Sequence, residues 1–148
     1  MARETCCRAS VPDRNLNDMQ DESLSETFSA AVEQLKNYRI GYLHVVESTQ
    51  DGRQNSERDW ALLRRLRELW TGFYIVNGGY DAARGEEAVL TGYADAVAYG
   101  RPFLANPDLP RRLQLGAPLN EPDQRTFYGG DARGYTDYPS LSQDNTVH

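Results

Sequence analysis

The stretch that decides the fold reads FYIVNGGYDAARGEEAVLTGYADAVAYGRPF and runs from Phe73 to Phe103. Two of its segments, Phe73–Val76 and Ala94–Tyr99, are short runs of strand-forming residues that soon reach a glycine. Between them, residues 81–92 are rich in helix-forming residues and predict a helix. A strand, a helix and a second strand with short connections indicate a βαβ unit, in which the strands are parallel.

The same alternation continues on both sides of this stretch. We expect a helix capped by Asp21 or Ser23 and ending near Asn37, a buried strand over Ile40–Val46, a helix over Trp60–Trp70, a helix over Asn106–Leu115, and at most a short strand near Cys7–Ser10. Helices that alternate with strands in this way predict an α/β fold with a parallel sheet. A closed eight-stranded βα-barrel needs about 250 residues, so the 148 residues predict a partial barrel.

The composition excludes several classes of protein. Hydrophobic residues make up 39% of the chain, enough for a packed core. The formal net charge of -6 argues against nucleic-acid binding, because no basic patch is available to neutralise phosphates. No apolar run approaches the roughly 18 residues of a membrane span, and the N-terminal residues are polar. We therefore expect a soluble, cytoplasmic protein with no membrane partner.

The cysteines and histidines do not predict a metal site. Cys6 and Cys7 are adjacent, and the chain has only two histidines, His44 and His148. Adjacent cysteines rarely form a disulfide, because its geometry is then strained. A zinc site built from so few ligands is not expected.

Two successive predicted strands end in a way that suggests a phosphate site. Asn77-Gly78-Gly79 follows the first strand and Tyr99-Gly100-Arg101 follows the second. In βα-barrels the loops after the last two strands commonly bind phosphate. Glycine lets backbone N–H groups approach the phosphate oxygens, and arginine adds a permanent planar cation. The simpler interpretation is that the glycines only form strand-to-helix turns, as glycine often does.

The sequence also resembles a known family. The run YIVNGGYDAARGEEAVLTGYADAVAYGRPFLANPDLPRRLQLGAPLN resembles the C-terminal barrel segment of old yellow enzymes, and RTFYGGDARGYTDYPSL and NDMQDESLSETFSAAVEQLKNYRIGYLHVVES fit in the same order. The resemblance covers roughly residues 13–142, and YGRPFLANPDLPRRL and GYTDYP are its most specific parts. The domain boundaries that follow are a polar segment over 1–22, the barrel segment over 23–142 and a tail over 143–148.

The resemblance implies an FMN-dependent oxidoreductase. In this family, hydride passes from NADH or NADPH through non-covalently bound FMN to an activated alkene, typically an enone. Carried over, Gly78, Gly79, Gly100 and Arg101 would hold the FMN phosphate, and Tyr135 of GYTDYP would line the substrate side of the flavin. The strands here would be the sixth, seventh and eighth of the barrel.

Some positions depart from the family pattern. The family's residues that hold the substrate oxygen, bind the flavin ring and donate the proton lie upstream of this segment, so no catalytic residue is assigned. An Arg-Leu-Ser-Pro run usually ends the fifth strand and supplies an arginine to the flavin; here Arg8-Ala9-Ser10-Val11-Pro12 fits it loosely, which makes Arg8 a cofactor candidate. The rival interpretations are a non-catalytic barrel fragment that keeps only the phosphate-binding half, and a phosphate-binding barrel unrelated to flavin.

Several other residues receive structural interpretations. We expect His44 to be a packed, hydrogen-bonded residue and Glu47 to be the partner of a neighbouring arginine. Residues that would pack against the rest of a closed barrel are expected to form a bare apolar surface that favours self-association: Ile40, Leu43, Val45, Phe73, Ile75, Val76, Ala96 and Val97. Three arginines, Arg64, Arg65 and Arg67, are expected to form a solvated helix face.

Overall fold

The computed structural model describes residues 5–10, 23–47, 55–129 and 131–141, with side chains from residue 23 onward. The chain forms two compact units, residues 1–98 and 99–148. The described strands all belong to the first unit, and the second unit contains short helices and an irregular segment.

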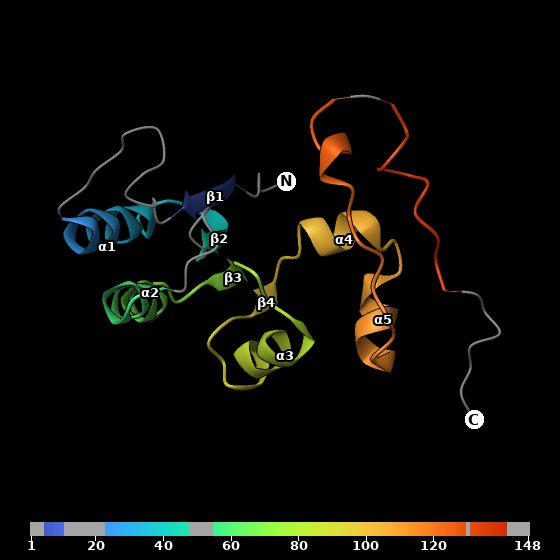
Figure 1. Cartoon of the computed structure of the whole chain (residues 1–148). Helices are drawn as coiled ribbons and strands as arrows, with labels where there is room; N and C mark the ends of the chain where they lie inside the picture. The colour runs from blue at the N-terminus through green and yellow to red at the C-terminus, as the bar shows by residue number, and fades with distance from the viewer. Residues whose placement is uncertain (1–4, 11–22, 48–54, 130, 142–148) are drawn as a thin grey trace. The chain divides into compact units, whose positions relative to one another are not determined.

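The first unit is built on a parallel sheet of four strands. The strands are β1 (Thr5–Ser10), β2 (Ile40–Val46), β3 (Phe73–Asn77) and β4 (Ala96–Val97), and they lie side by side in chain order (Figure 1). All three neighbouring pairs are parallel. This confirms the predicted α/β partial barrel. The last strand is shorter than predicted from the sequence, because only Ala96 and Val97 pair with β3.

Three helices connect the strands and lie along one side of the sheet (Figure 1). They are α1 (Leu24–Leu35), α2 (Glu57–Leu69) and α3 (Ala82–Leu90). Their buried residues include Leu24, Val32, Leu62, Leu63, Leu66, Leu69 and Ala88. The start of α2 is fixed by a capping box, in which the Ser56 hydroxyl accepts from Asp59 N–H and the Asp59 carboxylate accepts from Ser56 N–H.

The two faces of the sheet differ sharply in exposure. Leu43, Val45 and Val76 are fully buried, and Tyr74 is buried with them. Because side chains alternate along a strand and the helices lie on one side, these residues pack against the helices. The prediction that Leu43, Val45 and Val76 would be left bare was therefore wrong. On the opposite face Phe73 is 50% exposed.

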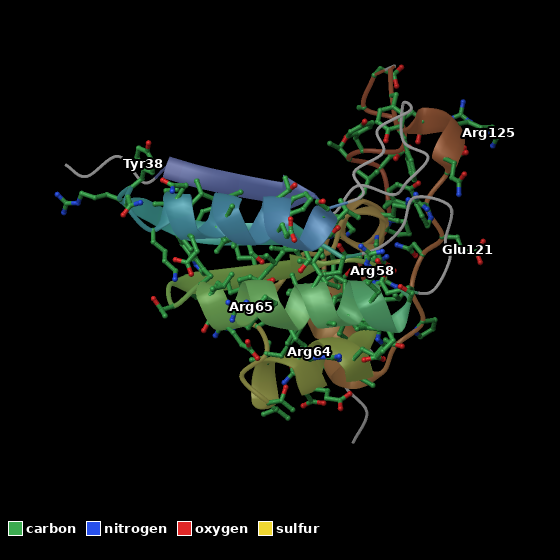
Figure 2. All side chains as sticks on the ribbon, turned by 90° about the vertical axis from the view of Figure 1, so that its left-hand side faces the viewer. Tyr38, Arg58, Arg64, Arg65, Glu121 and Arg125 are labelled. Carbon is green, nitrogen blue, oxygen red and sulfur yellow. The ribbon has the colours of Figure 1, made fainter. Side chains whose placement is uncertain are left out.

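The arginines of α2 do not behave alike. Arg64 forms an exposed ion pair with Glu57 at 2.6 Å, and Figure 2 shows Arg64 and Arg65 on the outward surface of α2. Arg67 instead lies over the Tyr74 ring at 5.3 Å from its centroid, and its Nη2 is 3.5 Å from an Asp95 carboxylate oxygen. The prediction of a solvated arginine was wrong for Arg67, because its guanidinium is held by the Tyr74 ring, the Asp95 carboxylate and nearby backbone carbonyls.

The second unit consists of short helices followed by an irregular segment. It contains α4 (Arg101–Ala105), α5 (Leu109–Leu115) and the 3-10 helix η1 (Gln124–Thr126). A single helix over Asn106–Leu115 was predicted, but Asn106 adopts an extended conformation and ends α4. The buried side chain of Asn106 bonds to the segment after α5, since Asn106 Oδ1 accepts from Asn120 N–H at 2.7 Å.

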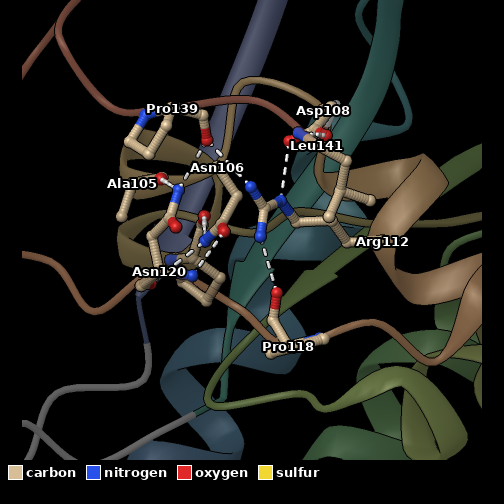
Figure 3. A network of polar contacts seen from close by, with 9 residues as sticks. Ala105, Asn106, Asp108, Arg112, Pro118, Asn120, Pro139 and Leu141 are labelled. Carbon is tan, nitrogen blue, oxygen red and sulfur yellow. Dashed lines mark hydrogen bonds and ion pairs between the residues drawn. The ribbon is translucent and has the colours of Figure 1, made fainter. Parts of the chain in front are cut away.

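A polar network attaches the irregular segment to these helices (Figure 3). Arg112, 5% exposed, pairs with the Asp108 carboxylate at 2.7 Å. Its Nη1 donates to the Pro118 carbonyl at 2.6 Å and its Nη2 to the Pro139 carbonyl at 2.8 Å. The second Asp108 oxygen accepts from Leu141 N–H at 2.8 Å. Arg112 thus connects α5 to backbone groups 6 and 27 residues away.

Candidate functional site

The carboxyl ends of three neighbouring strands meet at one edge of the sheet. Glu47 N–H, just after β2, donates to the Asn77 carbonyl at 2.7 Å, and Ala98 N–H, just after β4, donates to the Val76 carbonyl at 2.8 Å. The end of β3 is therefore joined by backbone hydrogen bonds to both neighbours. Gly78 and Gly79 follow this end directly, so the sheet fixes the start of the glycine loop.

The loop after β3 requires glycine for conformational reasons. Gly78 has φ 154° and Gly79 has φ 65°, in the region that residues with a Cβ rarely adopt. The next helix begins at once, since the Asp81 carboxylate accepts from Arg84 N–H at 2.8 Å and caps α3. The Gly79 carbonyl accepts from Arg84 Nη1 at 3.3 Å. The loop is thus a tight turn with a defined shape.

Gly100 and Arg101 begin α4 in the second unit, three and four residues after the end of β4. Gly100 has φ −87°, which any residue can adopt. A Cβ built on Gly100 would meet no atom of the described residues within 4 Å. Packing in the described part of the chain therefore does not require glycine here. Arg101 is exposed, which leaves its guanidinium accessible.

Asn77 contributes a side-chain contact that the sequence did not predict. Its Nδ2 donates to the Ala98 carbonyl at 2.6 Å, from the end of β3 to the end of β4. The sequence predicts Asn77 only as part of a strand-ending turn. The one signal available was an amide side chain directly before two glycines.

Glu47 lies in a buried cluster with two tyrosines rather than with an arginine. The Tyr80 hydroxyl donates to Glu47 Oε2 at 2.5 Å, and the Tyr93 hydroxyl donates to Glu47 Oε1. Glu47 is 4% exposed, and this burial raises the pKa of its carboxyl above the usual range although both hydroxyls act in the opposite direction. Burial also raises the pKa of each tyrosine hydroxyl, so both stay protonated donors. Arg84 contributes only at longer range.

Two other candidates remain predictions. Tyr135 is exposed, and its hydroxyl donates to the Phe127 carbonyl within the second unit. Arg8 lies in β1, in register with His44 of β2, and its side chain is outside the described part. His44 is half-buried.

The described residues contain no group of three or more histidine, cysteine or acidic side chains that could hold a metal ion. Within the same part of the chain, no helix is long and apolar enough to cross a membrane.

The sequence profile of the NADH:flavin oxidoreductase / NADH oxidase family matches residues 4–120. The chain belongs to this family. The cofactor of the family is FMN, with NADH or NADPH as the reductant. The resemblance to old yellow enzymes that the sequence predicted is thereby confirmed, and so is the partial barrel.

Several relatives of this family match more than half of the chain. The 12-oxophytodienoate reductase 2 of Arabidopsis thaliana is 48% identical over 111 residues, which are 74% of this chain and 30% of that relative. Morphinone reductase superposes with a TM-score of 0.83 at 37% identity, over 96% of this chain and 37% of its own. Its complex with tetrahydroNAD gives a TM-score of 0.80 at 38% identity, over 97% of this chain and 37% of its own. This chain spans only 20% to 37% of the length of the curated relatives compared with it.

Proposed function

We propose that this chain is the FMN-phosphate-binding part of an ene-reductase of the old yellow enzyme type. The observation that carries the proposal is the glycine loop Gly78-Gly79, held at the carboxyl end of β3 next to the end of β4. Family membership supports the reaction, in which hydride passes from NADH or NADPH to an activated alkene such as an enone. A cytoplasmic location belongs to the same proposal.

The residues of this chain fit the phosphate group of FMN. Gly79 and Gly100 have open space where a Cβ would stand, as far as the described residues show, so a ligand can approach their backbone closely. Arg101 supplies an exposed guanidinium suited to phosphate oxygens. FMN, when bound, supplies the hydride chemistry, and the task of these residues is to bind and position its phosphate.

The test compares FMN with riboflavin, which lacks the phosphate. Purified chain is titrated with each flavin, and binding is followed by quenching of flavin fluorescence. We expect FMN to bind more tightly than riboflavin, and Arg101→Ala to lose at least tenfold in FMN affinity, since it removes a charged hydrogen-bond donor worth roughly 1.5–3 kcal/mol. Arg111→Ala, an exposed arginine of α5, is the matched control. Equal affinity for the two flavins would refute the proposal.

A second candidate function is a non-catalytic fragment that only binds the phosphate end of FMN. The chain spans 20% to 37% of the length of the curated relatives that it matches. The family residues that activate the substrate oxygen have no counterpart in these 148 residues, and losing even one such donor typically costs about 10² to 10³ in rate. Reduction of cyclohexenone by NADPH, above the rate of free FMN, would favour the first candidate over this one.

A further inference from the structure

The backbone hydrogen bonds between β3 and β4 end one step before the glycine loop, where a side chain replaces the next backbone donor. In a regular parallel ladder the hydrogen bonds are evenly spaced. After the bond from Ala98 N–H to the Val76 carbonyl, the next bond would run from Gly78 N–H to the Ala98 carbonyl. That bond is not found among the described residues, and Asn77 Nδ2 donates to the Ala98 carbonyl instead, at 2.6 Å.

The side chain of Asn77 therefore takes the place of a backbone donor. A backbone carbonyl at the end of a strand needs a hydrogen-bond donor, because leaving it unpaired and shielded from water destabilises the fold. The Asn77 amide satisfies the Ala98 carbonyl from within β3, so the strand can end at Asn77. The chain then turns away at Gly78, whose φ of 154° departs from a strand.

We propose that Asn77 is a positioning residue, which frees the Gly78 N–H for the phosphate of the cofactor by satisfying the Ala98 carbonyl itself. The inference rests on the proposed function, because it assigns a task to a residue next to the FMN-phosphate loop. Ala98 is the last residue of the first unit, so the same bond also fixes the point where the chain leaves the sheet. Without the amide, Ala98 recruits Gly78 N–H and the ladder continues into the loop.

The experiment measures FMN and riboflavin affinity for the whole chain carrying Asn77→Ala. We expect FMN to bind about tenfold more weakly, because the phosphate loses roughly one hydrogen bond to a charged group. Riboflavin affinity should stay unchanged. Asn55→Ala is the matched control, because Asn55 Nδ2 donates to the Glu47 carbonyl at 2.6 Å after the neighbouring strand β2. It removes a similar amide-to-carbonyl bond without touching the glycine loop, and FMN affinity should not change.

The outcomes separate the inference from the proposed function. If the unmodified chain does not prefer FMN to riboflavin, the phosphate site itself is wrong. If that preference exists and Asn77→Ala keeps it, the role of Asn77 is overturned. An equal loss of affinity for both flavins would also overturn it, since a general loss of structure acts on both.

A measurement on the unmodified chain covers the case in which Asn77→Ala does not fold. The amide resonance of Gly78 is followed by NMR during titration with FMN and with inorganic phosphate. We expect it to exchange with solvent faster than the Ala98 amide when no ligand is present, and to shift and become protected when phosphate is added. A Gly78 amide that is already protected without ligand would contradict the inference.

Discussion

At the scale of single residues, Glu47 determines a pH dependence. Its carboxyl is buried, and burial raises its pKa in the folded chain above the ordinary value of 4.5. The folded state then binds the proton more tightly than the unfolded state. This tighter proton binding stabilises the folded state fully below about pH 4.5, where the carboxyl is protonated in both states. The stabilisation is lost as the pH rises through the raised pKa of the folded state.

The variant Glu47→Gln tests this directly. Glutamine keeps the shape of the side chain and removes the titration. As the pH is raised from about 4.5 to about 7, we expect the unmodified chain to lose free energy of unfolding relative to Glu47→Gln, measured by urea denaturation. Glu121→Gln, an exposed residue labelled in Figure 2, is the control and should follow the unmodified chain. A relative gain by the unmodified chain over this range would contradict the prediction.

At the scale of elements, Arg112 holds the segment after α5 in place. Replacing it by methionine keeps much of its bulk but removes the donors to the Pro118 and Pro139 carbonyls. The two carbonyls then lose their charged partner, so we expect the segment over 117–141 to open. Chymotrypsin should cleave Arg112→Met at Tyr128 or Tyr135 faster than it cleaves the unmodified chain.

The matched control for this element is Arg111→Met. Arg111 precedes Arg112 on the same helix but is exposed, so its loss should leave the cleavage rate unchanged. Equal cleavage of Arg112→Met and the unmodified chain would show that the network in Figure 3 does not hold the segment.

At the scale of the whole molecule, the sheet has features that favour association. Among the described residues, β1 and β4 are its edge strands, and sheet edges without a partner tend to bind other strands. Phe73, on the face opposite the helices, is 50% exposed. We expect concentration-dependent association in light scattering, and we expect Phe73→Ser to reduce it. Leu90→Ser is the control, since Leu90 is 79% exposed on α3. A monomer at high concentration, or equal effects of both variants, would count against this surface.

Local pattern in the sequence determined the order of the elements and the position of the glycine loop. The strand-forming run before Asn77, the two glycines and the helix that Asp81 caps are all encoded within a few residues, so propensity and turn chemistry suffice. The family could be predicted for the same reason, because YGRPFLANPDLPRRL is a long and specific run. The burial of Leu43 and Val45 could not be predicted, because the sequence does not show which face of a strand packs against the helices.

Only the tertiary structure decided the contacts between residues far apart in the chain. Glu47 meets Tyr80 and Tyr93, 33 and 46 residues away, and no local pattern indicates those pairs. The same holds for Asn77 and Ala98, which are 21 residues apart and become neighbours only because β3 and β4 are paired in parallel. Propensities act within a few residues, whereas a buried carboxylate or carbonyl takes whichever donor the packing of the sheet brings to it.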